Sequence, residues 1–221
     1  MNKKTLMIVT VLVFAVIVAA IVILNKQLEK TDQEQNAGKE VSIKNQPTIG
    51  DPDAPVTIVE FGDYKCPGCA GWSESIYPKL KKDYIDTGKV KFAFINVLFH
   101  GPESLLASLA SESVYNQDPE AFWDFHDALF AAQPTNQQHD EQWVTPDLLL
   151  DIAKEHAPNI DLDQLKKDIV EQGTLAAVEM DNQLVTEHNI KSTPSIIVNG
   201  VLVNEPFDYE ALKALIEKGL K

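Results

Sequence analysis

The chain has 221 residues and a formal net charge of −14, and it contains no arginine. Because contacts to phosphate groups need a basic face, this balance argues against a nucleic-acid-binding protein. The acidity mainly indicates solubility; a surface site for a divalent cation is the alternative, and the sequence does not identify its metal ligands.

Residues Leu6–Leu24 form an apolar run without a charge, and Lys3 and Lys4 precede it. As a helix this run would be about 28 Å long, close to the roughly 30 Å hydrocarbon core of a bilayer. Positive charges on its N-terminal side favour a cytoplasmic N-terminus. We therefore predict a cytoplasmic segment over residues 1–4, a single transmembrane anchor over 5–24 in the cell membrane, and an extracytoplasmic body. A cleaved signal peptide is the alternative interpretation.

Residues 25–48 are polar, with few apolar and no aromatic side chains. Such a segment buries too little surface to offset the entropy of ordering, so we predict a flexible linker. A flexible coil of this length spans roughly 25–30 Å. In an alternative interpretation its last part, Val41–Ile43, forms a first edge strand.

The body begins in the order strand, helix, strand. Residues 56–61 are a short β-branched run, which predicts a buried strand. A helical stripe of apolar residues starts near residue 66; Pro78 should kink this helix and Gly88 should end it. Residues 90–97 alternate and then run apolar, which predicts a second strand.

Between residues 102 and 189 apolar positions repeat with helical spacing in five segments, without a strand signal. Strands return at 195–198 and 201–203, joined by the hairpin turn that Asn199-Gly200 predicts. Asp208 is placed to cap a final helix. The prediction is an α/β protein in which one domain, made of residues 49–99 and 190–221, is interrupted by a helical insertion over 100–189.

The only two cysteines, Cys66 and Cys69, lie at the predicted start of the first helix, directly after the first strand. The dipole and unpaired N–H groups of a helix N-terminus stabilise a thiolate, so the pKa of Cys66 should be lowered. A stable thiolate is a good leaving group, which makes a Cys66–Cys69 disulfide easy to attack. We therefore predict Cys66 as the catalytic nucleophile and Cys69, one turn further on, as the buried resolving thiol.

A structural disulfide is an alternative role for this pair, but so small a loop gains little stability from a cross-link. A zinc site would need two further ligands, and the five histidines are scattered along the chain. His126 is expected in the core, because it lies on the apolar face of its predicted helix, and His100 is expected in a loop. Trp72, Trp123 and Phe125 are expected in the core rather than in a substrate groove.

The stretches Phe61–Cys69 (FGDYKCPGC) and Phe122–His126 (FWDFH), with Thr193-Pro194 before the hairpin, resemble the DsbA family of thiol–disulfide oxidoreductases. The resemblance covers about residues 41–221, includes the helical insertion, and is to Gram-positive members with a membrane anchor. It implies a thioredoxin-like fold. It also implies an extracytoplasmic enzyme that introduces disulfide bonds into secreted and envelope proteins by dithiol–disulfide exchange at Cys66-Pro67-Gly68-Cys69.

The resemblance further implies the partners of the reaction. No cofactor is required beyond the redox-active Cys66–Cys69 disulfide. Reduced envelope and secreted proteins are the clients, and a DsbB-like (BdbC) quinone-linked membrane oxidoreductase reoxidises the pair. An envelope reductase or isomerase is an alternative activity; a non-catalytic holdase for unfolded chains, with a structural disulfide, is an alternative from another class.

Two positions outside the cysteine motif have roles by this resemblance. Pro194 is expected to follow a cis peptide bond beside the disulfide, so that the backbone of Thr193 is exposed to a substrate strand; an ordinary trans proline is the alternative. Glu60 is expected to be a buried acid that exchanges protons with Cys69. A carboxylate at the end of the strand, facing water, is the alternative for Glu60.

The two inner positions of the motif, Pro67 and Gly68, support the active site. Pro67 falls at the first helical position, where its missing N–H costs nothing. Gly68 departs from the strongest oxidants of the family, which have a histidine there that helps to stabilise the thiolate. The departure concerns the degree of oxidising power and leaves the reaction type unchanged.

Overall fold

The computed structural model describes residues 12–14, 17–21, 38–134 and 141–221. The chain divides into two units, Met1–Gly38 and Lys39–Lys221. The predicted cytoplasmic segment, most of the predicted anchor and residues 25–37 of the predicted linker lie outside the described residues.

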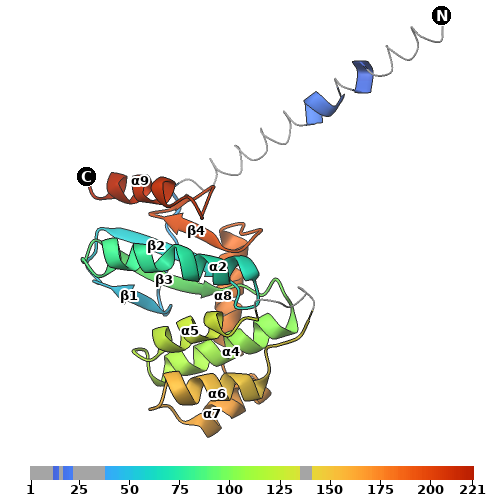
Figure 1. Cartoon of the computed structure of the whole chain (residues 1–221), viewed down its shortest axis with the longest axis vertical. Helices are drawn as coiled ribbons and strands as arrows, with labels where there is room; N and C mark the ends of the chain where they lie inside the picture. The colour runs from blue at the N-terminus through green and yellow to red at the C-terminus, as the bar shows by residue number, and fades with distance from the viewer. Residues whose placement is uncertain (1–11, 15–16, 22–37, 135–140) are drawn as a thin grey trace, which may run out of the picture. The chain divides into compact units, whose positions relative to one another are not determined.

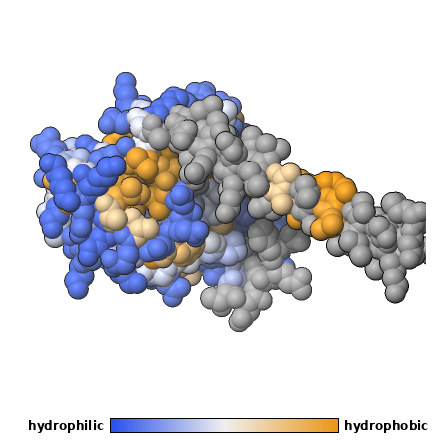
Figure 2. All heavy atoms as spheres, turned by 90° about the horizontal axis from the view of Figure 1, so that it is seen from above, coloured by the Kyte–Doolittle hydropathy of each residue, from blue (hydrophilic) through white to orange (hydrophobic). Residues whose placement is uncertain are grey.

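Residues 12–14 and 17–21 of the first unit are helical and uncharged. Figure 2 draws these residues in hydrophobic colours. Six of their large apolar side chains are exposed: Leu12, Val13, Phe14, Ile17, Val18 and Ile21. Within the described ranges no helix is both long and apolar enough to cross a membrane.

The second unit is built on one five-stranded sheet in the order β1-β3-β2-β4-β5. Its strands are β1 (Thr48–Gly50), β2 (Val56–Gly62), β3 (Val90–Asn96), β4 (Ser195–Val198) and β5 (Val201–Leu202). The central pair β2–β3 is parallel, and the other pairs are antiparallel. β2 and β3 are almost wholly buried because both faces of the sheet are covered, which explains their nearly continuous apolar sequence.

Side chains of β2 alternate between two apolar clusters, one on each face of the sheet. Val56 and Ile58 belong to a cluster that includes Trp72 of the first helix and continues into the insertion. Val59 and Phe61 belong to a smaller cluster on the other face. The same alternation places Glu60 on the face of Val56 and Ile58, toward the helix that carries the cysteines.

That first helix is broken as predicted. It consists of α2 (Pro67–Ser75), α3 (Tyr77–Leu80) and a π-helical turn, η1 (Lys81–Ile85), and the break at Ile76 comes two residues before Pro78. The last helix, α9 (Tyr209–Gly219), starts where predicted, because the Asp208 side chain accepts from the N–H groups of Glu210 and Ala211. The hairpin turn is also confirmed: Asn199 and Gly200 both have positive φ.

The described residues of the insertion form five helices and the turns between them, as the apolar spacing predicts. Its helices are α4 (Pro102–Gln117), α5 (Phe122–Ala131), α6 (Pro146–His156), α7 (Leu162–Glu171) and α8 (Leu175–Glu187). α5 contacts α2, and α8 contacts β3, so the insertion packs against the sheet domain. In Figure 1 helices α4 to α7 lie together at one end of the sheet.

The predicted linker ends earlier than expected. Residues 39–48 belong to the second unit, where Val41 is buried against the smaller cluster and the Gln46 side chain donates to Asp181 at 2.7 Å. The edge strand is β1 at Thr48–Gly50 rather than Val41–Ile43. The few apolar residues of this segment are enough to hold it in place, because they cover one face of strands β2–β4. The composition of the segment alone does not reveal that this face needs a cover.

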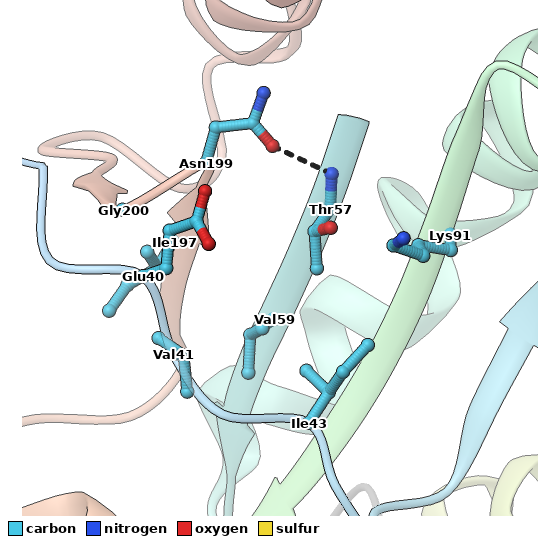
Figure 3. Close-up of a pocket in the computed structure, with 9 residues that line it drawn as sticks. All are labelled: Glu40, Val41, Ile43, Thr57, Val59, Lys91, Ile197, Asn199 and Gly200. Atoms are coloured by element: carbon cyan, nitrogen blue, oxygen red, sulfur yellow. Dashed lines mark hydrogen bonds between the residues drawn. The ribbon is translucent and has the colours of Figure 1, made fainter. Parts of the chain in front are cut away.

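A small cavity of about 190 Å³ lies between this N-terminal segment and the sheet. Figure 3 shows its nine lining residues, with Glu40, Val41 and Ile43 on one side and residues of β2, β3 and the β4–β5 hairpin on the other. The Asn199 side chain accepts from the N–H of Thr57 at 2.7 Å and so joins the hairpin to the start of β2.

Candidate active site

Cys66 and Cys69 occupy the first turn of α2 and are not bridged in this structure. Cys66 is the N-cap residue and Pro67 follows at the first helical position, as predicted. The exposed fraction is 8% for Cys66 and 0% for Cys69. An attacking thiol can therefore reach only the sulfur of Cys66.

The pKa values of the two thiols move in opposite directions. The pKa of Cys66 falls to about 5, chiefly because the Cys69 thiol donates a hydrogen bond to its sulfur; Thr193 and the N–H groups of Cys69 and Gly68 add to this effect, and burial opposes it. The pKa of Cys69 is raised, first by burial and then by its bond to Cys66 and the charge of Glu60. The site therefore holds a thiolate at Cys66 and a thiol at Cys69.

The Thr193–Pro194 peptide bond is cis, as the resemblance implies. As a thiol, Cys66 Sγ donates to the carbonyl oxygen of Thr193 at 3.4 Å. A Cβ atom added at Gly68 would lie 3.3 Å from Pro194 Cδ and 3.5 Å from Cys66 Sγ. The absence of a side chain at residue 68 thus lets the Thr193–Pro194 turn approach the reactive sulfur closely.

Glu60 is a buried acid, and the alternative of a carboxylate facing water is wrong. Its exposed fraction is 1%, and it lies between Phe94 and Ile196 in the sheet register. Burial above all, then the charges of Cys66 and Asp127, raise the pKa of Glu60 well above its usual range. Its Oε1 atom has no hydrogen-bond partner, which favours the neutral carboxyl.

Gly62 leaves the room that the Glu60 carboxyl occupies. A Cβ atom added at Gly62 would lie 3.0 Å from Glu60 Oε1 and 2.4 Å from the ring of Phe94. Any other residue at this position would have to displace the acid or the aromatic ring. The glycine in the Phe61–Cys69 motif is therefore required by the space that the buried acid occupies and not by an unusual backbone conformation.

The structure adds two charged residues that the sequence interpretation missed, Asp63 and Lys65, immediately before Cys66. Both are buried. Lys65 forms a buried ion pair with Glu103 of α4 and also donates to the carbonyl of Glu141 at 2.6 Å. Glu103 in turn accepts from the N–H groups of Trp143 and Val144 at 2.7 and 2.8 Å. Two charges between a buried strand and the cysteines were the available signal in the sequence.

The aromatic residues singled out in the sequence lie in the core, as expected. Trp72, Trp123 and Phe125 are buried. His126 is buried as well, where its Nδ1 pairs with the Tyr64 hydroxyl at 2.8 Å and burial lowers its pKa to about 3. His100 lies in the loop between β3 and α4 and pairs with Asp63.

A groove of about 720 Å³ runs between α2–α3 and α5 and begins at Pro67, beside Cys66. Its floor combines apolar side chains such as Tyr77 and Phe130 with the charged Lys81 and Asp127. As for metals, the described residues hold no group of three or more His, Cys, Asp or Glu side chains placed to bind an ion.

Comparison with known proteins supports the reading of this site. The sequence model of a thioredoxin family matches residues 42–218. Disulfide bond formation protein D of Bacillus subtilis (strain 168) is 48% identical over 193 residues, which cover 87% of this chain and 85% of that protein. The probable disulfide bond formation protein D of Bacillus anthracis is 40% identical over 190 residues, covering 86% and 85%.

Solved structures agree with these relatives. Oxidised BdbD from Bacillus subtilis matches with a TM-score of 0.80 at 47% identity, covering 83% of this chain and 97% of that one. DsbA of Chlamydia trachomatis matches with a TM-score of 0.69 at 27% identity, covering 80% and 93%. The predicted α/β fold with a helical insertion is thereby confirmed, and the chain belongs to the thioredoxin family, among the DsbA-like thiol–disulfide oxidoreductases related to BdbD.

Proposed function

We propose that this protein is an extracytoplasmic oxidase that introduces disulfide bonds into secreted and envelope proteins. One observation carries the proposal: the pKa of Cys66 is lowered to about 5 while that of Cys69 is raised. Because the Cys66 thiolate is stabilised, the reduced pair is favoured and the oxidised pair readily passes its disulfide on. The relatives named disulfide bond formation protein D support the same direction of reaction.

The proposed exchange transfers the disulfide to the client in two steps. A thiolate of the reduced client attacks Cys66 Sγ, the Cys66–Cys69 bond breaks, and a client–Cys66 mixed disulfide forms. Cys69 leaves and takes up a proton, since burial raises its pKa. A second client thiolate attacks the client sulfur, and Cys66 leaves as a thiolate. The client has lost two electrons and gained a disulfide, and the enzyme holds those electrons as a dithiol.

Glu60 is the proposed proton donor and acceptor for Cys69. The charge of Glu60 contributes to the raised pKa of Cys69, and the raised pKa of Glu60 keeps a proton available in the buried site. Glu60→Gln keeps the shape and removes the transferable proton, so reoxidation of the pair by oxidised glutathione should slow by about tenfold or more. Glu155→Gln, at an exposed position of α6, is the control. An unchanged rate and pH profile in Glu60→Gln would refute the proton role.

A DsbB-like (BdbC) quinone-linked membrane oxidoreductase is the proposed source of oxidising equivalents, and Leu6–Leu24 is the proposed anchor. The uncharged helical residues 12–14 and 17–21, with their exposed apolar side chains, support an anchor, as do Lys3 and Lys4 before it. Protease added to intact protoplasts should degrade the body and leave a membrane-bound N-terminal stub. A chain recovered from the medium with its N-terminus near Ile21 would contradict anchoring.

The reduction potential of the Cys66–Cys69 pair tests the proposed direction. Equilibration in glutathione buffers should give a potential more positive than about −200 mV, toward the roughly −120 mV of a strong oxidant. A value near that of thioredoxin, about −270 mV, would instead identify an envelope reductase. The measurement needs only the purified protein and the fraction of free thiol in each buffer.

A further inference from the structure

Asp63 contacts both cysteines through its main chain. Its N–H donates to Cys69 Sγ at 3.4 Å, and its carbonyl oxygen accepts from the N–H of Cys66 at 2.9 Å. The first of these bonds opposes part of the rise in the pKa of Cys69 that burial causes. The position of residue 63 therefore determines where both sulfurs lie.

The Asp63 carboxylate is held from two sides. Its exposed fraction is 1%. Oδ1 accepts from the N–H of Lys65 at 2.9 Å, which closes an Asx turn. Oδ2 accepts from the Ser104 hydroxyl at 2.9 Å and from His100, through its N–H at 3.2 Å and its ring Nδ1 at 2.7 Å. Since a carboxylate can only accept, we assign the proton to His100 Nδ1.

His100 and Ser104 belong to the start of the helical insertion, in the β3–α4 loop and the first turn of α4. A negative charge is favourable at this place, next to a helix N-terminus. Cys66, the N-cap residue of α2, donates its N–H to the carbonyl oxygen of Asp63, so α2 starts directly from this turn. The start of α2 therefore depends on the turn over residues 63–66, and the insertion fixes that turn.

We propose that Asp63 is a positioning residue for thiol–disulfide exchange: gripped by His100 and Ser104, it places Cys66 at the start of α2 and Cys69 within reach of it. The insertion thus acts on the two sulfurs through residue 63. This inference rests on the proposed function only in that both concern the same cysteine pair. It extends that function to residues more than 30 positions away in the sequence, since His100 and Ser104 follow Asp63 by 37 and 41.

Asp63→Asn tests the proposal by the sign of its effect on the Cys66 pKa. The amide cannot accept all four hydrogen bonds, so the turn loosens and the pKa of Cys66 should rise by about one unit, the size expected for one weakened bond to a charged group. Loss of the negative charge alone would instead lower that pKa, since a nearby anion disfavours a thiolate. Titration of thiolate absorbance gives the answer, and Asp151→Asn, exposed on α6, is the control. An unchanged or lowered pKa overturns the proposal.

His100→Gln and Ser104→Ala keep the proposal testable if Asp63→Asn fails to fold, because each removes one donor and leaves residue 63 intact. Each should raise the Cys66 pKa, and each should lower about threefold to tenfold the equilibrium constant for oxidation of glutathione by the pair. Combining either with Asp63→Asn should add little, because all act through one carboxylate. Additive effects would refute the shared route. A reduction potential near that of thioredoxin in the unmodified protein would refute the proposed oxidase function. It would leave this test of Asp63 unaffected.

Discussion

The two sides of Cys66 are built differently. On one side the turn over residues 63–66 is buried, and its two charged side chains are both paired with groups of the insertion. On the other side the Thr193–Pro194 turn follows two exposed residues, Lys191 and Ser192, and meets Cys66 through the Thr193 carbonyl. One side is held by buried pairs, and the other is half-buried at Thr193 and leads to two exposed residues.

This difference separates two tasks that thiol–disulfide exchange imposes on one sulfur. The sulfur must be held in a fixed position, which needs a buried turn that does not reorganise during the reaction. The substrate must also approach the sulfur and pair with the backbone beside it, which needs a surface that the protein leaves uncovered. A closed side and an open side around Cys66 meet both demands, and each can be altered separately.

The largest effect should come from removing either sulfur. Cys66→Ser should abolish oxidation of a reduced test protein, because Cys66, at 8% exposure against 0% for Cys69, carries the sulfur that a client can reach. Cys69→Ser should leave a reactive Cys66 and accumulate mixed disulfides with clients, since no internal thiol resolves them. Non-reducing gels of cell extracts distinguish the two. Clients trapped by Cys66→Ser would reverse the assignment, and activity retained in Cys66→Ser would indicate a holdase.

Removing one partner of the Lys65–Glu103 ion pair, on the closed side of Cys66, should have the next largest effect. Glu103→Gln leaves the Lys65 ammonium buried without a counter-charge, and the free energy of unfolding should fall by about 3–5 kcal/mol in a urea titration. The matched control is Asp86→Asn, which breaks the exposed Lys81–Asp86 pair and should cost about 1 kcal/mol or less.

A double change separates the charge from the packing. Lys65→Met combined with Glu103→Gln leaves no buried charge, so it should recover part of the lost stability. Equal losses in Glu103→Gln and Asp86→Asn would show that the closed side is not held by this pair.

The redox state should change stability in a pH-dependent way. The pKa of Cys66 is about 5 in the folded protein and about 8.5 in an unfolded chain, so its contribution is present above pH 8.5 and is lost as the pH falls to 5. At pH 7 the reduced protein should gain roughly 2–3 kcal/mol from this thiolate relative to reduced Cys66→Ser. Denaturant titrations of the reduced, oxidised and Cys66→Ser proteins measure it. A clearly more stable oxidised form would indicate a structural disulfide.

The fold was predictable because its signals are local. Alternation in residues 56–61 and 90–97, helical spacing between 102 and 189, and the Asn199-Gly200 turn each act over a few residues. The docking of residues 39–48 was not predictable, because the apolar face that it covers is assembled from β2, β3 and β4, far apart in the chain.

The residues of the active site also fall into a part that was predictable from the sequence and a part that was not. The cysteines, the cis Thr193–Pro194 bond and buried Glu60 followed from a motif and a family resemblance. The roles of Asp63 and Lys65 did not follow, because the side chains that pair with them lie 37 to 41 residues away. Spacing alone does not show which polar residue at the start of the insertion meets which residue of the turn. The closed side of Cys66 is therefore the part that required a structure.

The smallest effect should come from the open side. Thr193→Val keeps the shape and the backbone groups of residue 193 and removes only the hydroxyl that helps to lower the pKa of Cys66. That pKa should rise by less than one unit, and the kcat/KM for a reduced client should change little, since a substrate strand pairs with the retained backbone. Titration of thiolate absorbance in Thr193→Val and in Asp63→Asn compares the Cys66 pKa of the two variants directly. If Thr193→Val shifted the pKa as much as Asp63→Asn, the open side would share the control of the thiolate, and the division of labour around Cys66 would fail.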